Sequence, residues 1–314
     1  MKPRDEMTPS IDVHIYQDDA VRALAWCIGA PDLMRVVPGM QFSSPNTHLE
    51  ALAEATPWLR SLDQDPAPLH QHLAVHSSWK VGVYFESLLA FWLAWNPRYT
   101  VVGHNLQVRD DTRTLGAFDF LLRNASGQAE HWEVAVKYYL QREVSGDWSA
   151  WVGPNQRDRL DIKLARMRDH QLPLSSRAEA ESVLSNVGVT SAPRQRAVLK
   201  GQLFTHWRTS SERPIGSRAG SPTGQWVETE HFEEYAASFP DHRWVTREKP
   251  DWLGPCRCVS VDARTPSAWL QARIDAGVDR PQMMSRLMRL DGNTWIEDGL
   301  IFVVSDDWST RGRP

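Results

Sequence analysis

Apolar side chains first recur with helical spacing in residues 18–28, where Asp18 and Asp19 suit the first turn of a helix. The pattern is then lost in residues 31–68, which several prolines interrupt. That stretch is expected to be mostly loop, with room for a short helix over residues 47–55.

The first strong element is a segment that is apolar nearly all round. A helix is predicted from a cap at Ser77 or Ser78 to about Trp95, and Pro97 prevents its continuation. Because no face of this helix is polar, we expect it to lie buried against a sheet. Glu86 interrupts the apolar residues in the middle of the helix.

Three strands follow, in which the spacing of apolar residues changes from helical to alternating. They are predicted at residues 99–108, 115–123 and 130–140, and the last has Val134 and Val136 alternating with polar or small residues. The turn residues that separate them are few, so the strands are expected to form successive antiparallel hairpins.

A charged helix is predicted beyond the third strand, beginning at Asn155 or Asp158 and running to about His170. A fourth strand is expected at residues 196–204, and a polar stretch rich in Gly, Ser and Pro follows at residues 209–225. Further short strands are expected at residues 243–247, 257–261 and 300–304.

These elements predict an α/β fold whose core has the order helix, three antiparallel strands, helix, strand. A helical and loop segment at residues 1–76 precedes that core, which we place at residues 77–208. The stretch 209–225 is predicted as a flexible loop, and residues 226–314 as a smaller α/β extension packed on the core.

Charge and cysteine content narrow the class of protein. The 35 basic and 39 acidic side chains give a net charge of −4, which disfavours a protein that coats nucleic acid non-specifically but leaves room for a local basic face. Three cysteines, Cys27, Cys256 and Cys258, are too few for a disulfide framework and fit a reducing compartment. With a polar start and no apolar run long enough to cross a bilayer, the chain is expected to be cytoplasmic and to lack a membrane partner.

Charged residues inside the predicted core elements are the strongest chemical signal. Asp119 lies in the second strand, and Glu133 and Lys137 lie in the third, all among apolar neighbours. A charge in such a setting is costly unless it is paired or holds a metal. A buried ion pair between Asp119 and Lys137 is the structural alternative, and a binding or catalytic site that also uses Glu86 is the functional one.

This arrangement resembles the PD-(D/E)XK nuclease superfamily, in which an acid on one strand and an acid-x-Lys on the next converge at a metal ion. The resemblance implies a core of the restriction-endonuclease-like type and a Mg²⁺ or Mn²⁺ site held by Asp119, Glu133 and Glu86, with Lys137 beside it. The sequence departs from the motif at Ala135, where the second acid usually stands. Glu133 is four residues from Lys137, about 13 Å of strand, so the superfamily's inactive members are an alternative.

A resemblance over most of the chain is to an uncharacterised bacterial family, domain of unknown function 1853, which is grouped by fold with the nucleases. The blocks that carry it are residues 81–86, 116–122, 131–140, 153–164, 199–201 and 302–308. Its label names no activity.

The most distinctive of these blocks contains Asn155, Arg157, Arg159 and Lys163, which are either a solvated helix face or a phosphate-binding group beside the site. The resulting hypothesis is a magnesium-dependent nuclease with a nucleic-acid partner, DNA before RNA. The alternative is a catalytically inactive nuclease-like module that binds nucleic acid or a protein partner.

Overall fold

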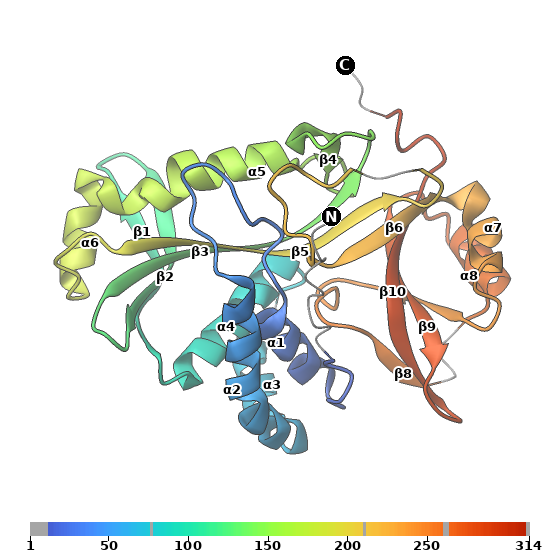
Figure 1. The fold of residues 1–314 in the computed structure, drawn as a ribbon, viewed down its shortest axis with the longest axis horizontal. Helices are drawn as coiled ribbons and strands as arrows, with labels where there is room; N and C mark the ends of the chain where they lie inside the picture. The colour runs from blue at the N-terminus through green and yellow to red at the C-terminus, as the bar shows by residue number, and fades with distance from the viewer. Residues whose placement is uncertain (1–11, 76–77, 210–211, 260–263, 312–314) are drawn as a thin grey trace, which may run out of the picture.

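The computed structural model describes residues 12–75, 78–209, 212–259 and 264–311. In this part of the chain one mixed sheet of ten strands runs the length of the molecule, and helices lie on both of its faces (Figure 1). The main path through the sheet is β1-β2-β3-β5-β6-β10-β9-β7, with β4 paired to β3 and β8 paired to β10. The α/β class predicted from the sequence is therefore confirmed.

The strands are β1 (Tyr99–Arg109), β2 (Thr114–Asn124), β3 (Ala129–Gln141), β4 (Trp151–Val152), β5 (Arg194–His206), β6 (Thr223–Glu228), β7 (Arg243–Arg247), β8 (Arg257–Val259), β9 (Gln282–Arg289) and β10 (Thr294–Val304). The helices are α1 (Asp19–Gly29), α2 (Pro45–Gln64), α3 (Ala67–Val75), α4 (Val81–Trp95), α5 (Leu160–Arg166), α6 (Glu181–Asn186), α7 (Phe232–Ala237) and α8 (Pro266–Asp275). None of the described helices is long and apolar enough to cross a bilayer.

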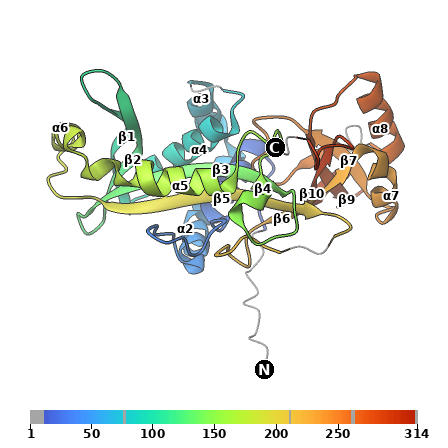
Figure 2. The ribbon, with the colours of Figure 1, turned by 90° about the horizontal axis from the view of Figure 1, so that it is seen from above.

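The predicted order of helix, three antiparallel strands, helix and strand is present as α4, β1, β2, β3, α5 and β5. Strands β1, β2 and β3 pair antiparallel, and β5 returns parallel to β3. The chain between β3 and β5 crosses one face of the sheet with α5, as the view from above shows (Figure 2). At the β3–β5 contact, Gly201 has φ +133° and its absent side chain leaves room for the Lys137 carbonyl, which a Cβ would meet at 1.7 Å.

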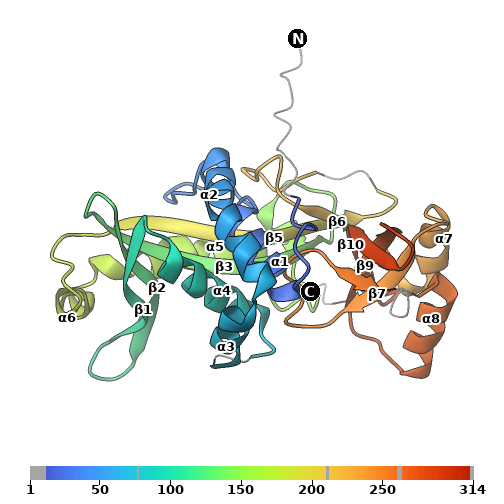
Figure 3. The same cartoon turned by 90° about the horizontal axis from the view of Figure 1, so that it is seen from below.

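The opposite face carries α1 and α4 (Figure 3). Phe85, Leu88 and Trp92 of α4 belong to the same apolar cluster as Val134 and Val136 of β3. The predicted burial of this helix is confirmed. Its N-cap is Lys80 rather than either of the predicted serines, of which Ser77 lies outside the described residues.

The N-terminal segment is more helical than its prolines suggest. Helix α1 begins after Asp18, whose carboxylate accepts the backbone N–H groups of Ala20 and Val21, as the sequence predicts. The prediction of a loop with only a short helix is wrong for α2, a helix of 20 residues that begins at Pro45 and contains Pro57. Ser44 caps it, and one missing backbone hydrogen bond at an internal proline is tolerated because the helix packs on α1 and α4.

The C-terminal part of the chain continues the sheet instead of forming a separate one. Strand β6 begins at Thr223, within the stretch predicted as a loop, and pairs parallel to both β5 and β10. Strand β7 lies where the sequence places it, and β8 ends at Val259, with residue 261 outside the described residues. The weakly patterned β9, α7 and α8 were not predicted. The division into domains stays a prediction.

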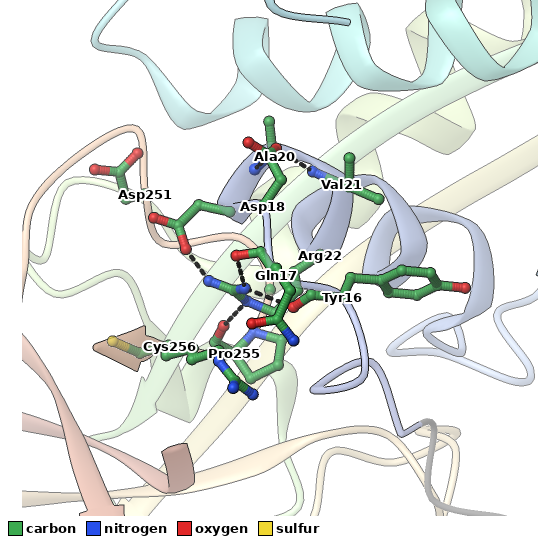
Figure 4. A network of polar contacts seen from close by, with 12 residues as sticks. Tyr16, Gln17, Asp18, Ala20, Val21, Arg22, Asp251, Pro255 and Cys256 are labelled. Atoms are coloured by element: carbon green, nitrogen blue, oxygen red, sulfur yellow. Dashed lines mark hydrogen bonds and ion pairs between the residues drawn. The ribbon is translucent and has the colours of Figure 1, made fainter. Parts of the chain in front are cut away.

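A buried arginine ties the first helix to this C-terminal part. Arg22 of α1 is 1% exposed, and its guanidinium donates to the carbonyls of Tyr16 and Gln17 at 2.7 Å and to that of Pro255 at 3.2 Å (Figure 4). Asp19, at the start of the same helix, forms an ion pair with it. The charge is thus paired and hydrogen-bonded, as burial requires.

Candidate functional site

The two central strands of the predicted core separate at Asp119. Strands β2 and β3 pair only from Phe120 opposite Trp132 outward. At the next position the Asp119 carboxylate accepts the backbone N–H of Val134 at 2.9 Å, in place of a strand-to-strand bond. The Asp119 side chain thus satisfies a backbone N–H group at the point where the ladder between β2 and β3 ends.

Glu133 lies beside Asp119 on the neighbouring strand and is 1% exposed. The side-chain amide of Gln171 donates to its Oε1, and His131 Nε2 is 3.9 Å from its Oε2. That Oε2 is buried without a hydrogen-bond donor among the described residues. A buried carboxyl oxygen without a donor is costly when the group is ionised, so Glu133 is stable there as the neutral acid or with a cation or water beside it.

Burial raises the pKa of Glu133, and the neighbouring Asp119 charge raises it further. The pKa of Asp119 is also raised by burial, although the Val134 N–H and a hydrogen bond with Glu133 oppose the shift. The pair therefore favours the state in which one of the two carboxyl groups keeps its proton over the state in which both are ionised. Such a pair accepts a cation with relief of its mutual repulsion.

Glu86 reaches the same cluster from α4. Burial raises its pKa to about 7, with a further contribution from the charge of Asp119. Helix α4 covers the Val134 face of β3, whereas Ala135 on the α5 side belongs to a separate apolar cluster. Carboxyl groups from α4, β2 and β3 therefore interact through their charges.

A lysine also belongs to this cluster, and it is not the one in the strand. Lys163 of α5 donates to Gln171 Oε1 at 3.1 Å, so Gln171 bridges Lys163 and Glu133. Burial lowers the pKa of Lys163, while the charges of Glu133 and Asp119 oppose that shift. A π-helical turn, Met167–Gln171, follows α5 and sets the direction of the Gln171 side chain.

Lys137 faces a different partner. Its Nζ is 2.5 Å from Asp158 Oδ2, and both side chains are about one-third exposed. This pair lies toward the far end of β3, four residues from Glu133. Charge interactions therefore link Glu86, Asp119 and Glu133 with Lys163, whereas Lys137, which the sequence places beside the carboxylates, pairs with Asp158.

The residues predicted to bind phosphates lie in three different environments. Asn155 and Arg157 are exposed in the loop before α5. Arg159 holds Asp161 with two hydrogen bonds of 2.9 and 2.6 Å, and Lys163 is in the carboxyl cluster. Gln171 was missed altogether, because nothing in the sequence distinguishes it from other polar residues of a charged helix.

The donor set limits the kind of metal site that these residues could form. No group of three or more His, Cys, Asp or Glu side chains that could hold a metal ion occurs within the described ranges. Mg²⁺ usually keeps several waters and uses one or two carboxylates together with substrate phosphate oxygens. The Asp119–Glu133 pair, with an unpartnered buried oxygen, fits that smaller requirement.

The fold and this cluster define an α/β protein with interacting carboxyl groups where two strands of a mixed sheet cease to pair. The profile of the family described as domain of unknown function (DUF1853) matches residues 22–304, so the chain belongs to that family. None of the curated proteins and none of the solved structures matches the chain.

Replacing Glu86 by glutamine is expected to stabilise the protein at alkaline pH. The folded-state pKa of about 7 lies above the ordinary value near 4.5, so wild-type stability falls as pH rises through that window. In urea denaturation at pH 8, the free energy of unfolding of Glu86→Gln should therefore exceed that of the wild type by about 1–3 kcal/mol. The difference should vanish below about pH 4.5. Glu50→Gln, at an exposed position of α2, is the control. A stability difference that did not change with pH would contradict this assignment.

Proposed function

We propose that the protein is a metal-dependent nuclease with a core of the PD-(D/E)XK type, which hydrolyses phosphodiester bonds in nucleic acid in the cytoplasm. The observation that supports this is the meeting of Glu86, Asp119 and Glu133 with Lys163 where β2 and β3 separate. Structural carboxylates are normally ionised and paired, whereas these have raised pKa values and an open oxygen.

In the proposed mechanism Asp119 and Glu133 would hold a Mg²⁺ or Mn²⁺ ion, and Glu86 would be a third carboxyl group near them. The ion, when bound, supplies Lewis-acid stabilisation of the phosphoryl group and lowers the pKa of a bound water. Gln171 orients Glu133 and Lys163 through its amide. The Lys163 ammonium adds positive charge near the phosphoryl group, on which negative charge develops during the reaction. Asn155 and Arg157 contact the substrate backbone outside the carboxyl cluster.

A second candidate is a non-catalytic module that binds nucleic acid or a protein partner. Ala135 at the usual position of the second acid favours this alternative, as does the pairing of Lys137 with Asp158. The two candidates differ in one measurable respect, because only the first requires a metal-dependent change in the substrate.

The direct test incubates the purified full chain with Mg²⁺ or Mn²⁺ and with single-stranded, duplex and branched DNA, then with RNA. We expect cleavage of at least one substrate that EDTA abolishes. Binding without cleavage of every substrate would favour the non-catalytic module, and neither binding nor cleavage would contradict both.

The two lysines can be separated by substitution with methionine, which keeps most of the side-chain volume and removes the charge. Lys163→Met is expected to lower cleavage by about 10²-fold, because Lys163 faces the carboxyl cluster. Lys137→Met should have a comparable effect only if the Lys137–Asp158 pair opens during the reaction. Single-turnover rates with saturating metal, with circular dichroism to confirm folding, give the comparison. Full activity in both variants would exclude lysine from the mechanism.

A further inference from the structure

A pocket lies near the C-terminal half of β3, close to Lys137. It has a volume of about 370 Å³, and its lining includes Trp79, Asn155, Lys249, Trp252 and Arg280. These residues come from the segment before α4, the loop before α5, the loop after β7 and the segment before β9. The pocket is therefore built by the proposed nuclease core together with the C-terminal part of the chain.

The two tryptophans of this pocket differ in how they are held. Trp252 is fixed by its indole N–H, which donates to the Arg247 carbonyl at 2.9 Å, and by edge contacts with Tyr138 and Phe302. Trp79 is 67% exposed, and Lys249 Nζ is 6.0 Å from its ring centroid. The exposed Trp79 ring at the rim of the pocket offers a flat apolar face on which a planar group can stack.

Positive charge surrounds the tryptophans. Lys249 Nζ is 4.6 Å from the Trp252 ring centroid, and its pKa is lowered by burial and then by the positive charges of Arg280 and Lys137. Glu248 offsets part of this charge through an ion pair of 3.5 Å with Arg280. An aromatic ring with an ammonium group beside it offers a nucleotide two contacts. The ring stacks on the base, and the ammonium pairs with the phosphate.

We infer that this pocket binds single-stranded nucleic acid, with an unpaired base stacked on Trp79 and backbone phosphates on Lys249 and Arg280. The inference rests on the proposed function, because it makes the pocket a subsite for the same nucleic-acid substrate. Four residues of strand, ~13 Å at ~3.3 Å per residue, separate Glu133 from Lys137, and a few nucleotides span that distance. A duplex hides the base faces in its stack, so stacking on Trp79 selects an unpaired segment.

The test measures binding without cleavage. Fluorescence anisotropy in EDTA gives the affinity of the full-length protein for labelled oligothymidylate, for oligouridylate and for a duplex of the same length. We expect the single strands to bind more tightly than the duplex, and Trp79→Ala to weaken single-strand binding about 5- to 100-fold. Lys249→Gln should lower the slope of log affinity against log salt by about 0.7, the value for one phosphate contact on a single strand.

Two control variants match these substitutions in chemistry but lie elsewhere. Trp95→Ala removes a tryptophan that is 39% exposed at the other end of α4, where it stacks on Trp58. Arg208→Gln removes a cation that lies 4.3 Å from the Trp207 ring centroid. Neither residue lines the pocket, so both variants should bind oligothymidylate as the wild type does.

The outcomes also separate this inference from the nuclease proposal. Weakened single-strand binding in Trp79→Ala, with no cleavage by the wild type under any metal, would support the pocket and overturn the nuclease. Cleavage by the wild type, with unchanged affinity in Trp79→Ala and an unchanged salt slope in Lys249→Gln, would overturn the pocket alone. Preference for the duplex would also overturn it.

Discussion

Replacing Asp119 by asparagine is expected to lower metal-dependent hydrolysis by at least 10²–10³-fold while the protein stays folded. The side-chain oxygen that accepts the Val134 N–H is kept in asparagine, so the strand junction is preserved. The negative charge that would hold the cation is lost, and losing one electrostatic stabiliser of a transition state typically has an effect of this size. Single-turnover cleavage with increasing Mn²⁺ measures the effect, and the variant should also need more metal for its residual rate.

Asp111→Asn is the matched control, because Asp111 is an exposed aspartate in the turn between β1 and β2. It should cleave at the wild-type rate. Glu133→Gln tests the partner carboxyl, and it should reduce the rate more than Glu86→Gln if Glu133 is the second ligand. Undiminished activity in folded Asp119→Asn would place the chemistry elsewhere in the molecule.

The candidate carboxylates could be predicted from the sequence because they interrupt strong local patterns. Asp119 and Glu133 stand in strands whose apolar alternation is clear, and Glu86 stands in a helix that is otherwise apolar. Strand spacing also indicates that about 13 Å of strand separates Glu133 from Lys137.

The rest of the cluster depends on tertiary structure. Lys163 lies on a charged helix whose pattern fits a solvated face, and Gln171 lies in the turn after it. Only the crossing of this segment over the sheet brings them to Glu133. The Trp79 pocket needs the C-terminal part of the sheet, where helix and strand patterns are weak. Helix α2 is longer than its prolines predict, because packing in the main apolar cluster stabilises it.

The N-terminal segment is tied to the sheet by a second buried charged network, which the proposed chemistry does not use. Lys200 of β5 is 1% exposed, and its ammonium donates to the Ala30 carbonyl and, at 3.1 Å, to His48 Nδ1. His48 Nε2 in turn lies 3.0 Å from Asp32 Oδ2, and the other Asp32 oxygen accepts the Leu199 N–H at 3.1 Å. Burial lowers the pKa of Lys200 to about 8, so the ammonium is kept at neutral pH mainly by Asp32.

Asp32→Ala is accordingly expected to lower the free energy of unfolding by about 3–5 kcal/mol, the cost of leaving one member of a buried charged group without its partner. Urea unfolding at pH 7 measures it. Lys200→Met should cost less, because a flexible apolar side chain fills the site of the lysine stem and no unpaired cation remains.

The double variant distinguishes a charge network from simple packing. If Asp32 and Lys200 act through each other, then Asp32→Ala combined with Lys200→Met should be destabilised by clearly less than the sum of the two single changes, because the uncompensated ammonium is removed together with its carboxylate. Additive losses would show that each side chain contributes only its own contacts. Asp12→Ala, at an exposed position, controls for the loss of an acid in the same segment. Because α1, α2 and α4 share one apolar cluster with β3, loosening the network is expected to weaken the packing of that cluster.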